Sequence, residues 1–110
     1  MESTSLSSLV EEQLTAARAA ASGRAARTIH GGHDRSLRET VIALVSGREL
    51  SEHESPGEAT LHVLSGRVRV FSDAASWEGS PGDLIVIPDT RHGLESLTDS
   101  AVLLTVVKGR

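Results

Sequence analysis

Residues 82–92, GDLIVIPDTRH, contain the features that decide the fold. Gly82 and Pro88 enclose the short apolar run Leu84–Ile87, and His92 follows the proline. A short aliphatic run between turn-forming residues is typical of a buried β-strand. We therefore expect a strand over Leu84–Ile87, with His92 just beyond the turn that ends it.

Similar runs occur on both sides of this stretch. They occupy Arg24–His30, Leu37–Val45, Thr60–Leu64, Arg67–Phe71 and Ala101–Val107. Gly, Pro, Ser and Asp are concentrated between the runs, and Ser65-Gly66 has the character of a tight hairpin turn. Many short strands with no long helices between them indicate an all-β sandwich or barrel rather than a parallel βαβ sheet.

The first segment of the chain has a helical period. One apolar face would carry Leu6, Leu9, Val10, Leu14 and Ala17. Ser8 and Glu11 have capping-box spacing, and Gly23 is a plausible stop after the alanine-rich run. We expect an N-terminal helix within residues 1–23, packed on the domain or on a second copy, and a β-domain over residues 24–110.

Composition excludes several classes of protein. A chain of 110 residues, 38% of them hydrophobic, has room for one core. The absence of cysteine excludes disulfides, thiolate metal sites and cysteine nucleophiles. A net charge of −4 and 2% aromatic residues argue against nucleic-acid binding. No apolar run suits a membrane span and the N-terminus lacks a signal-peptide pattern, so we expect a cytoplasmic protein without a membrane partner.

The common catalytic motifs are also absent from the sequence. Its glycine-rich turns lack the Lys-Ser/Thr pair of a phosphate-binding loop and the helix of a dinucleotide fingerprint. No serine lies in a nucleophile elbow. The sequence therefore nominates no catalytic residue, and whether the protein is an enzyme stays open.

Two stretches resemble the paired motifs of the cupin superfamily. Positions of the first motif are matched by Gly47, His53 and Gly66, and positions of the second by Gly82, Pro88 and His92, with one residue fewer between proline and histidine. The resemblance covers roughly residues 37–107. It implies a small antiparallel jelly-roll barrel, or double-stranded β-helix, with one added N-terminal α-helix.

The family's metal-ligand positions are only partly present. In cupins that bind metal, two histidines and a glutamate of the first motif meet one histidine of the second. His53 and His92 occupy two of these positions, but Ser55 replaces the other histidine and Ala59 the glutamate. Ser96 stands where the second motif ends in asparagine. Because catalytic metals usually have three protein ligands, the resemblance implies at most a weakened site for Zn, Fe, Mn, Ni or Cu.

Glu58 or His62 could complete a metal site with His53 and His92. In an unbroken strand, however, Glu58 and His62 share one face, while the other face carries Ala59, Leu61 and Val63. If Ala59 faces the interior, Glu58 and His62 point away from it. A bulge near Pro56-Gly57 would reverse the faces. The candidate metal ligands are His53, His92, Glu58 and His62.

Without a metal, the same region predicts a small-molecule pocket. Aliphatic and small side chains with one or two imidazoles give an apolar cavity with few polar groups. The predicted ligand-binding residues are His53, Ser55, Ala59, Leu61, Val63 and His92, and Val86 is expected to line the barrel with them. The leading hypothesis is a small-molecule-binding protein with an accessory or sensor role. The alternative is a metal-dependent oxygenase, isomerase or lyase that uses His53 and His92.

A homodimer is a further expectation, since it is common among small cupins. Pairing of two copies would cover exposed strand edges, for which Ala101–Val107 is a candidate.

Overall fold

The computed structural model describes residues 1–53 and 57–108, and only the backbone of Glu52 and His53. Helix α1 (Leu6–Ala19) precedes the strands. The strands are β1 (Arg24–His30), β2 (Leu37–Leu44), β3 (Glu49–His53), β4 (Gly57–Ser65), β5 (Val68–Phe71), β6 (Ser76–Gly79), β7 (Leu84–Val86), β8 (His92–Ser96) and β9 (Ser100–Lys108).

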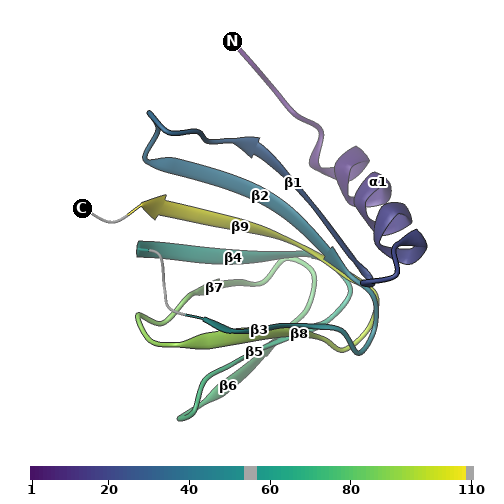
Figure 1. Ribbon diagram of the computed structural model, residues 1–110, viewed down its shortest axis with the longest axis vertical. Coiled ribbons are helices and arrows are strands. Elements are labelled where there is room, and N and C mark those ends of the chain that lie inside the picture. The colour runs from purple at the N-terminus through teal and green to yellow at the C-terminus, as the bar shows by residue number, and fades with distance from the viewer. Residues whose placement is uncertain (54–56, 109–110) are drawn as a thin grey trace.

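The strands form two sheets that face each other. One sheet has the order β1-β2-β9-β4-β7 and the other the order β3-β8-β5-β6, and the paired strands are antiparallel. Figure 1 shows that the sheets meet on one side of the view, at the start of β1, and diverge toward the C-terminus. This architecture confirms the predicted all-β jelly-roll barrel with one N-terminal helix.

Alternation along the strands decides which side chains fill the core. On β4, Ala59, Leu61 and Val63 are buried, whereas Glu58 is exposed. The main core cluster consists of Leu44, Ala59, Leu61, Val63, Val68, Val70, Ile87, Leu94, Val102 and Val106. These residues come from both sheets, so one core holds the sheets together.

The connection at Ser65-Gly66 differs from the predicted hairpin. β4 pairs with β7 and β9, whereas β5 pairs with β6 and β8, so the two strands lie in different sheets. Gly66 has φ +76°, a conformation that favours glycine. The hairpin prediction was therefore wrong, because two adjacent β-runs with a turn between them give no information about which sheet each run joins.

Ser96 ties the two sheets together where they meet. Its hydroxyl lies 3.1 Å from the carbonyl oxygen of Leu44 and 2.8 Å from that of Thr98, and it also contacts the hydroxyl of Ser100. Ser96 and Ser100 are almost completely buried. At this motif position the chain thus has a structural hydrogen bond between β8 and β2.

Helix α1 covers one part of the outer face of the five-stranded sheet. Leu14 and Ala17 pack with Ala43 of β2 and Ala101 of β9, and Figure 1 shows the helix beside β1 and β2. The N-cap is Ser5, whose side chain accepts a hydrogen bond from the Ser8 amide at 3.2 Å. The helix therefore begins before the predicted Ser8–Glu11 capping box, and it ends at Ala19, before Gly23.

Strand β9 is not an edge of its sheet. It lies between β2 and β4 and is paired with both. The expectation that Ala101–Val107 is an exposed edge was wrong, because the last run inserts into the middle of the sheet. The homodimer stays a prediction, and any pairing through strand edges would have to use another strand.

The helix is fastened to the loop before β9 by Asp99. Its carboxylate accepts a hydrogen bond from the Ser46 amide at 2.8 Å and forms an ion pair with Arg18 at 2.9 Å. The pKa of Asp99 lies below its ordinary value of 3.8. The hydrogen bond from the Ser46 N–H is the larger cause, and the hydrogen bond from the Arg18 guanidinium is the next.

This lowered pKa predicts an acid-sensitive contribution to stability. The contribution is complete above the unfolded-state pKa and is lost as the pH falls through the lower, folded-state pKa. In urea titrations between about pH 5 and pH 2, the free energy of unfolding should fall less steeply for Asp99→Asn than for the parent protein. Arg18→Gln should reduce the pH dependence of the free energy of unfolding less than Asp99→Asn does, because the Ser46 N–H contributes the larger part of the pKa shift. Equal slopes for the parent and Asp99→Asn would contradict the prediction.

In the described part of the chain, no helix combines the length and apolar character needed to cross a membrane.

Candidate functional site

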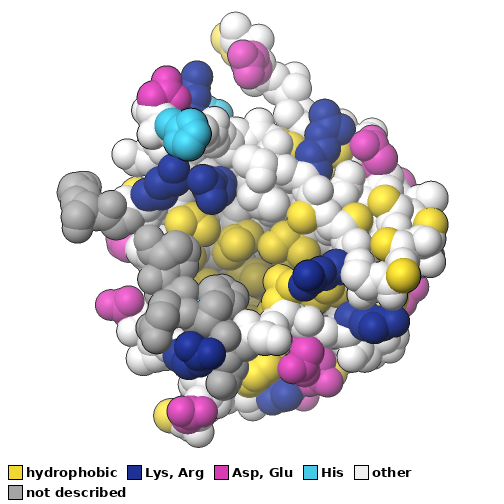
Figure 2. All heavy atoms as spheres, in the orientation of Figure 1, with side chains coloured by type: hydrophobic (Ala, Val, Ile, Leu, Met, Phe, Trp, Pro, Cys, Tyr) yellow, Lys and Arg dark blue, Asp and Glu magenta, His cyan; other side chains and the backbone are white. Residues whose placement is uncertain are grey.

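A hollow opens between the two sheets on the face shown in Figure 2. Hydrophobic side chains gather at its floor, and Lys or Arg side chains lie around it. Its outer part has a volume of about 390 Å³, and a deeper cavity of about 40 Å³ shares the lining residues Ile42 and Leu50 with it. Ile42 comes from β2 and Leu50 from β3, so the two sheets each supply one wall.

The inner cavity is small and mostly apolar. It is lined by Ile42, Leu50, Leu61, Val70, Ile87, His92, Gly93, Leu94 and Leu104. Its volume is close to the share of one water molecule in the liquid, about 30 Å³. The interior is thus largely filled by its own aliphatic side chains.

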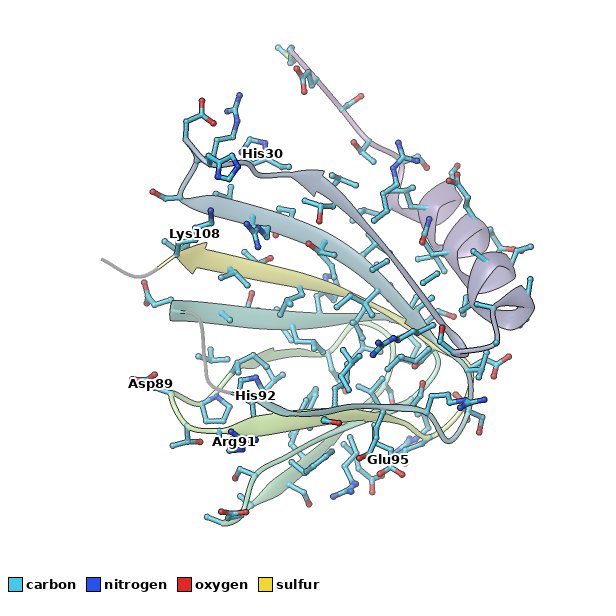
Figure 3. The ribbon with its side chains drawn as sticks, viewed as in Figure 1. His30, Asp89, Arg91, His92, Glu95 and Lys108 are labelled. Carbon is cyan, nitrogen blue, oxygen red and sulfur yellow. The ribbon has the colours of Figure 1, made fainter. Side chains whose placement is uncertain are left out.

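His92 is the polar side chain in this inner lining. It is the first residue of β8 and is 7% exposed. Its Nδ1 lies 2.9 Å from the Thr90 carbonyl oxygen, which can only accept, so Nδ1 carries the proton. In the neutral ring, Nε2 is then the acceptor nitrogen. Figure 3 shows His92 at the end of the barrel where Asp89, Arg91 and Lys108 also lie.

His53 and His92 occupy neighbouring positions on paired strands. Their Cα atoms are partners in the ladder between β3 and β8, next to a register shift after Leu50. Two residues distant in the sequence are therefore adjacent in the fold at the level of the backbone. The side chain of His53 and the whole of Ser55 lie outside the part of the chain that the structure describes.

The outer hollow has residues that the sequence analysis missed. It is lined by Ser22, Arg24, Ala25, Ala26, Thr40, Ile42 and Leu50. The Thr40 hydroxyl lies 3.1 Å from that of Thr28 on the adjacent strand. Alternation within the run 37–44 could have placed Thr40 and Ile42 on one face, but their position opposite Leu50 depends on how the sheets pack.

The predicted pocket residues have different places in the fold. Leu61 lines the inner cavity, whereas Val63 is 0% exposed within the core and lines neither the cavity nor the hollow. Ala59 faces the core beside them. Val86 is 73% exposed, so its expected place inside the barrel was wrong. The reason is register: Val86 pairs with Thr60 and shares its outward face, while Ile85 and Ile87 point inward.

A metal centre built from His53, His92, Glu58 and His62 does not fit this geometry. Glu58 is exposed, and His62 alternates with the core residues Leu61 and Val63, so both side chains are on the opposite face of β4 from the interior. They cannot contact an ion that His92 holds inside. In residues 1–53 and 57–108, the described side chains include no group of three His, Asp or Glu residues placed to hold a metal ion.

The described lining of a larger hollow, of about 650 Å³, does not include His92. It runs along β4 and residues 86–89 and consists of Gly57, Glu58, Ala59, Thr60, Val86, Ile87, Pro88 and Asp89. Glu58 and Val86 are on the outward face of the sheet. We place the functional site between the sheets instead, because only there do both halves of the barrel and His92 contribute.

The fold and the hollow define a small, single-core jelly-roll barrel. No protein-family model matches the sequence, and no curated protein matches it. A conserved protein of unknown function from Streptococcus pyogenes is 32% identical, with 79% of this chain and 75% of that one covered and a TM-score of 0.71. An RmlC-like cupin from Desulfovibrio desulfuricans is 24% identical over 97% and 96% of the two chains, with a TM-score of 0.74.

Several further similar structures are described as cupins. This chain shares the jelly-roll fold of these cupin structures. A transcriptional regulator of the HTH_3 family from Vibrio cholerae is 25% identical, with a TM-score of 0.67. The match covers 79% of this chain but 52% of the regulator, so the shared part is about half of that protein.

Proposed function

We propose that this protein binds a small, largely apolar organic molecule between its sheets, in an accessory or sensor role. The observation that supports this best is the outer hollow of about 390 Å³, which shares the lining residues Ile42 and Leu50 with the inner cavity that His92 also lines. A concave site of several hundred Å³ with aliphatic walls and a few polar groups is typical of small-molecule binding. His92 supplies one such group at the inner end.

The sensor role is supported by similarity to part of a regulator. The HTH_3 family protein from Vibrio cholerae is a transcriptional regulator, and this chain resembles about half of it. In such a role, the barrel would transmit ligand binding through contacts with another protein. We do not propose a metal-dependent reaction, because the candidate ligands Glu58 and His62 point away from His92.

A fluorescent neutral probe tests the proposal. N-phenyl-1-naphthylamine emits strongly only in an apolar environment, and we expect saturable binding with one site per chain. Ile42→Trp places a bulky ring in the wall shared by the cavity and the hollow, so it should weaken binding at least about ten-fold. Leu84→Trp is the matched control, because Leu84 is 61% exposed on the outer side of β7.

The outcomes separate the hollow from other apolar surfaces. Loss of binding in Ile42→Trp, with Leu84→Trp unchanged and both variants unfolding cooperatively, supports the proposal. Should Ile42→Trp fail to fold, Leu50→Trp tests the same space from the opposite sheet. Unchanged binding in a folded variant of either wall residue would overturn the proposal.

A further inference from the structure

Arg24 is the only cationic side chain among the described residues that line the outer hollow. It is the first residue of β1 and is paired with Leu44, a residue of the main core. Directly paired residues of antiparallel strands point to the same side of the sheet. Ala25, the next residue, packs against the cluster under the helix on the other side. Arg24 is therefore on the inner side of the sheet, facing the space between the sheets.

The positive charge of Arg24 has no carboxylate partner in the described structure. The arginines that form ion pairs there are Arg18, Arg27, Arg67 and Arg69. The described lining of the hollow and of the inner cavity contains no aspartate or glutamate. The site thus combines an aliphatic floor with one uncompensated guanidinium, in a chain whose overall charge is −4.

Arg27 on the same strand provides a useful contrast. It lies an odd number of residues from Arg24, so its side chain is on the opposite side of β1. There it forms an ion pair with Glu12 of α1 at 3.3 Å. One arginine of β1 is thus matched by an acid of the helix, while the one beside the hollow is not.

We propose that the molecule bound in the hollow is an organic anion, with its charged group on Arg24 and its apolar body on Ile42 and Leu50. This inference rests on the proposed function and specifies the ligand's chemical class. A guanidinium donates two parallel hydrogen bonds to a carboxylate, sulfonate or phosphate group, a geometry that neutral molecules use poorly. The hydroxyl of Thr40, also in the lining, is an additional donor for the same group when Thr28 donates the hydrogen bond between the two threonines.

Two fluorescent probes that differ only by one sulfonate group measure how much the negative charge of the ligand contributes to binding. 8-Anilinonaphthalene-1-sulfonate has the ring system of N-phenyl-1-naphthylamine with an added sulfonate. In the parent protein, we expect the sulfonate to bind about ten-fold more tightly than the neutral probe, as for one charge-assisted hydrogen-bonded pair. Arg24→Gln should remove this preference while it changes the affinity for the neutral probe less than about two-fold. Arg24→Lys should keep part of the preference, because a lysine keeps the charge but not the fork of donors.

Two controls connect the effect to this arginine. Arg27→Gln removes the same charge from the outer side of β1 and should leave the affinities for both probes unchanged. Raising the ionic strength from about 0.01 to 1 M should lower the affinity for the sulfonate probe but not for the neutral probe, because salt screens the attraction between the sulfonate and Arg24.

The results distinguish failure of this inference from failure of the proposed function. Binding of the neutral probe in the hollow with no preference for the sulfonate, or a preference that survives in Arg24→Gln, would overturn the anion assignment and leave the pocket standing. If neither probe binds between the sheets, the proposed function fails and the anion assignment fails with it.

Discussion

Replacing Gly66 with alanine is expected to destabilise the protein by about 2–5 kcal/mol, combining left-handed strain with a steric collision. Gly66 has φ +76°, and a Cβ atom there would collide with the Asp99 carbonyl oxygen and lie 2.7 Å from Ser100 Cα. These are backbone atoms at the start of β9, so they cannot rotate away as a side chain would. Urea unfolding followed by circular dichroism measures the loss.

Gly47→Ala is the matched control for this prediction. Gly47 has φ +84°, a similar conformation, but a Cβ atom there would meet nothing within 4 Å among the described residues. This variant should lose about 1–2 kcal/mol, the cost of the left-handed conformation alone. If the two variants lost the same free energy of unfolding, the close approach of Gly66 to β9 would not matter for stability.

Leu44→Ala is expected to cost about 2–5 kcal/mol, the usual range for a buried leucine. Leu44 is 2% exposed at the end of β2, in the core cluster to which both sheets contribute. Its removal leaves a cavity where the sheets meet, and the backbone there is fixed by the hydrogen bond from Ser96 to the Leu44 carbonyl. The neighbouring side chains can therefore collapse only partly into the space. Thermal and urea unfolding both report the change.

Leu84→Ala gives the comparison for Leu44→Ala. Leu84 is also a strand leucine, but it is 61% exposed on the outer side of β7. Its replacement should change the free energy of unfolding by less than about 1 kcal/mol, as for most surface substitutions. A loss at Leu84 as large as that at Leu44 would show that the outer face of β7 is covered, for instance by a second copy of the chain.

The five-stranded sheet could be predicted from sequence period, and most of the four-stranded sheet could not. Runs such as Arg24–His30 and Leu37–Leu44 alternate and are rich in β-branched or aliphatic residues. By contrast, β3 (ELSEH), β6 (SWEG) and β8 (HGLES) are short and mostly polar, with glycine in two of them. Such strands form because β5 pairs with β6 and β8, β8 pairs with β3, and Val68, Val70 and Leu94 supply a core. This is tertiary context, which outweighs β-propensity.

The site was only partly predictable for a related reason. The resemblance identified His92, and alternation along β4 separated Leu61 from Glu58 and His62. Neither argument pointed to Arg24 or Leu50, since each lines the hollow only because of the register between strands and the packing between sheets. A local pattern tells which residues share a face of one strand, but it does not tell what that face meets.

The hydrogen bonds of Ser96 with Leu44 and of Asp99 with Ser46 have a consequence for protein engineering. They hold the molecule at the end opposite His92, so the loop between β1 and β2, residues 31–36, can be lengthened or exchanged without removing any of them. Libraries that vary this loop should therefore keep these hydrogen bonds and a melting temperature close to the parent's. The fold thus keeps these stabilising hydrogen bonds at one end of the barrel and a loop that tolerates substitution at the other.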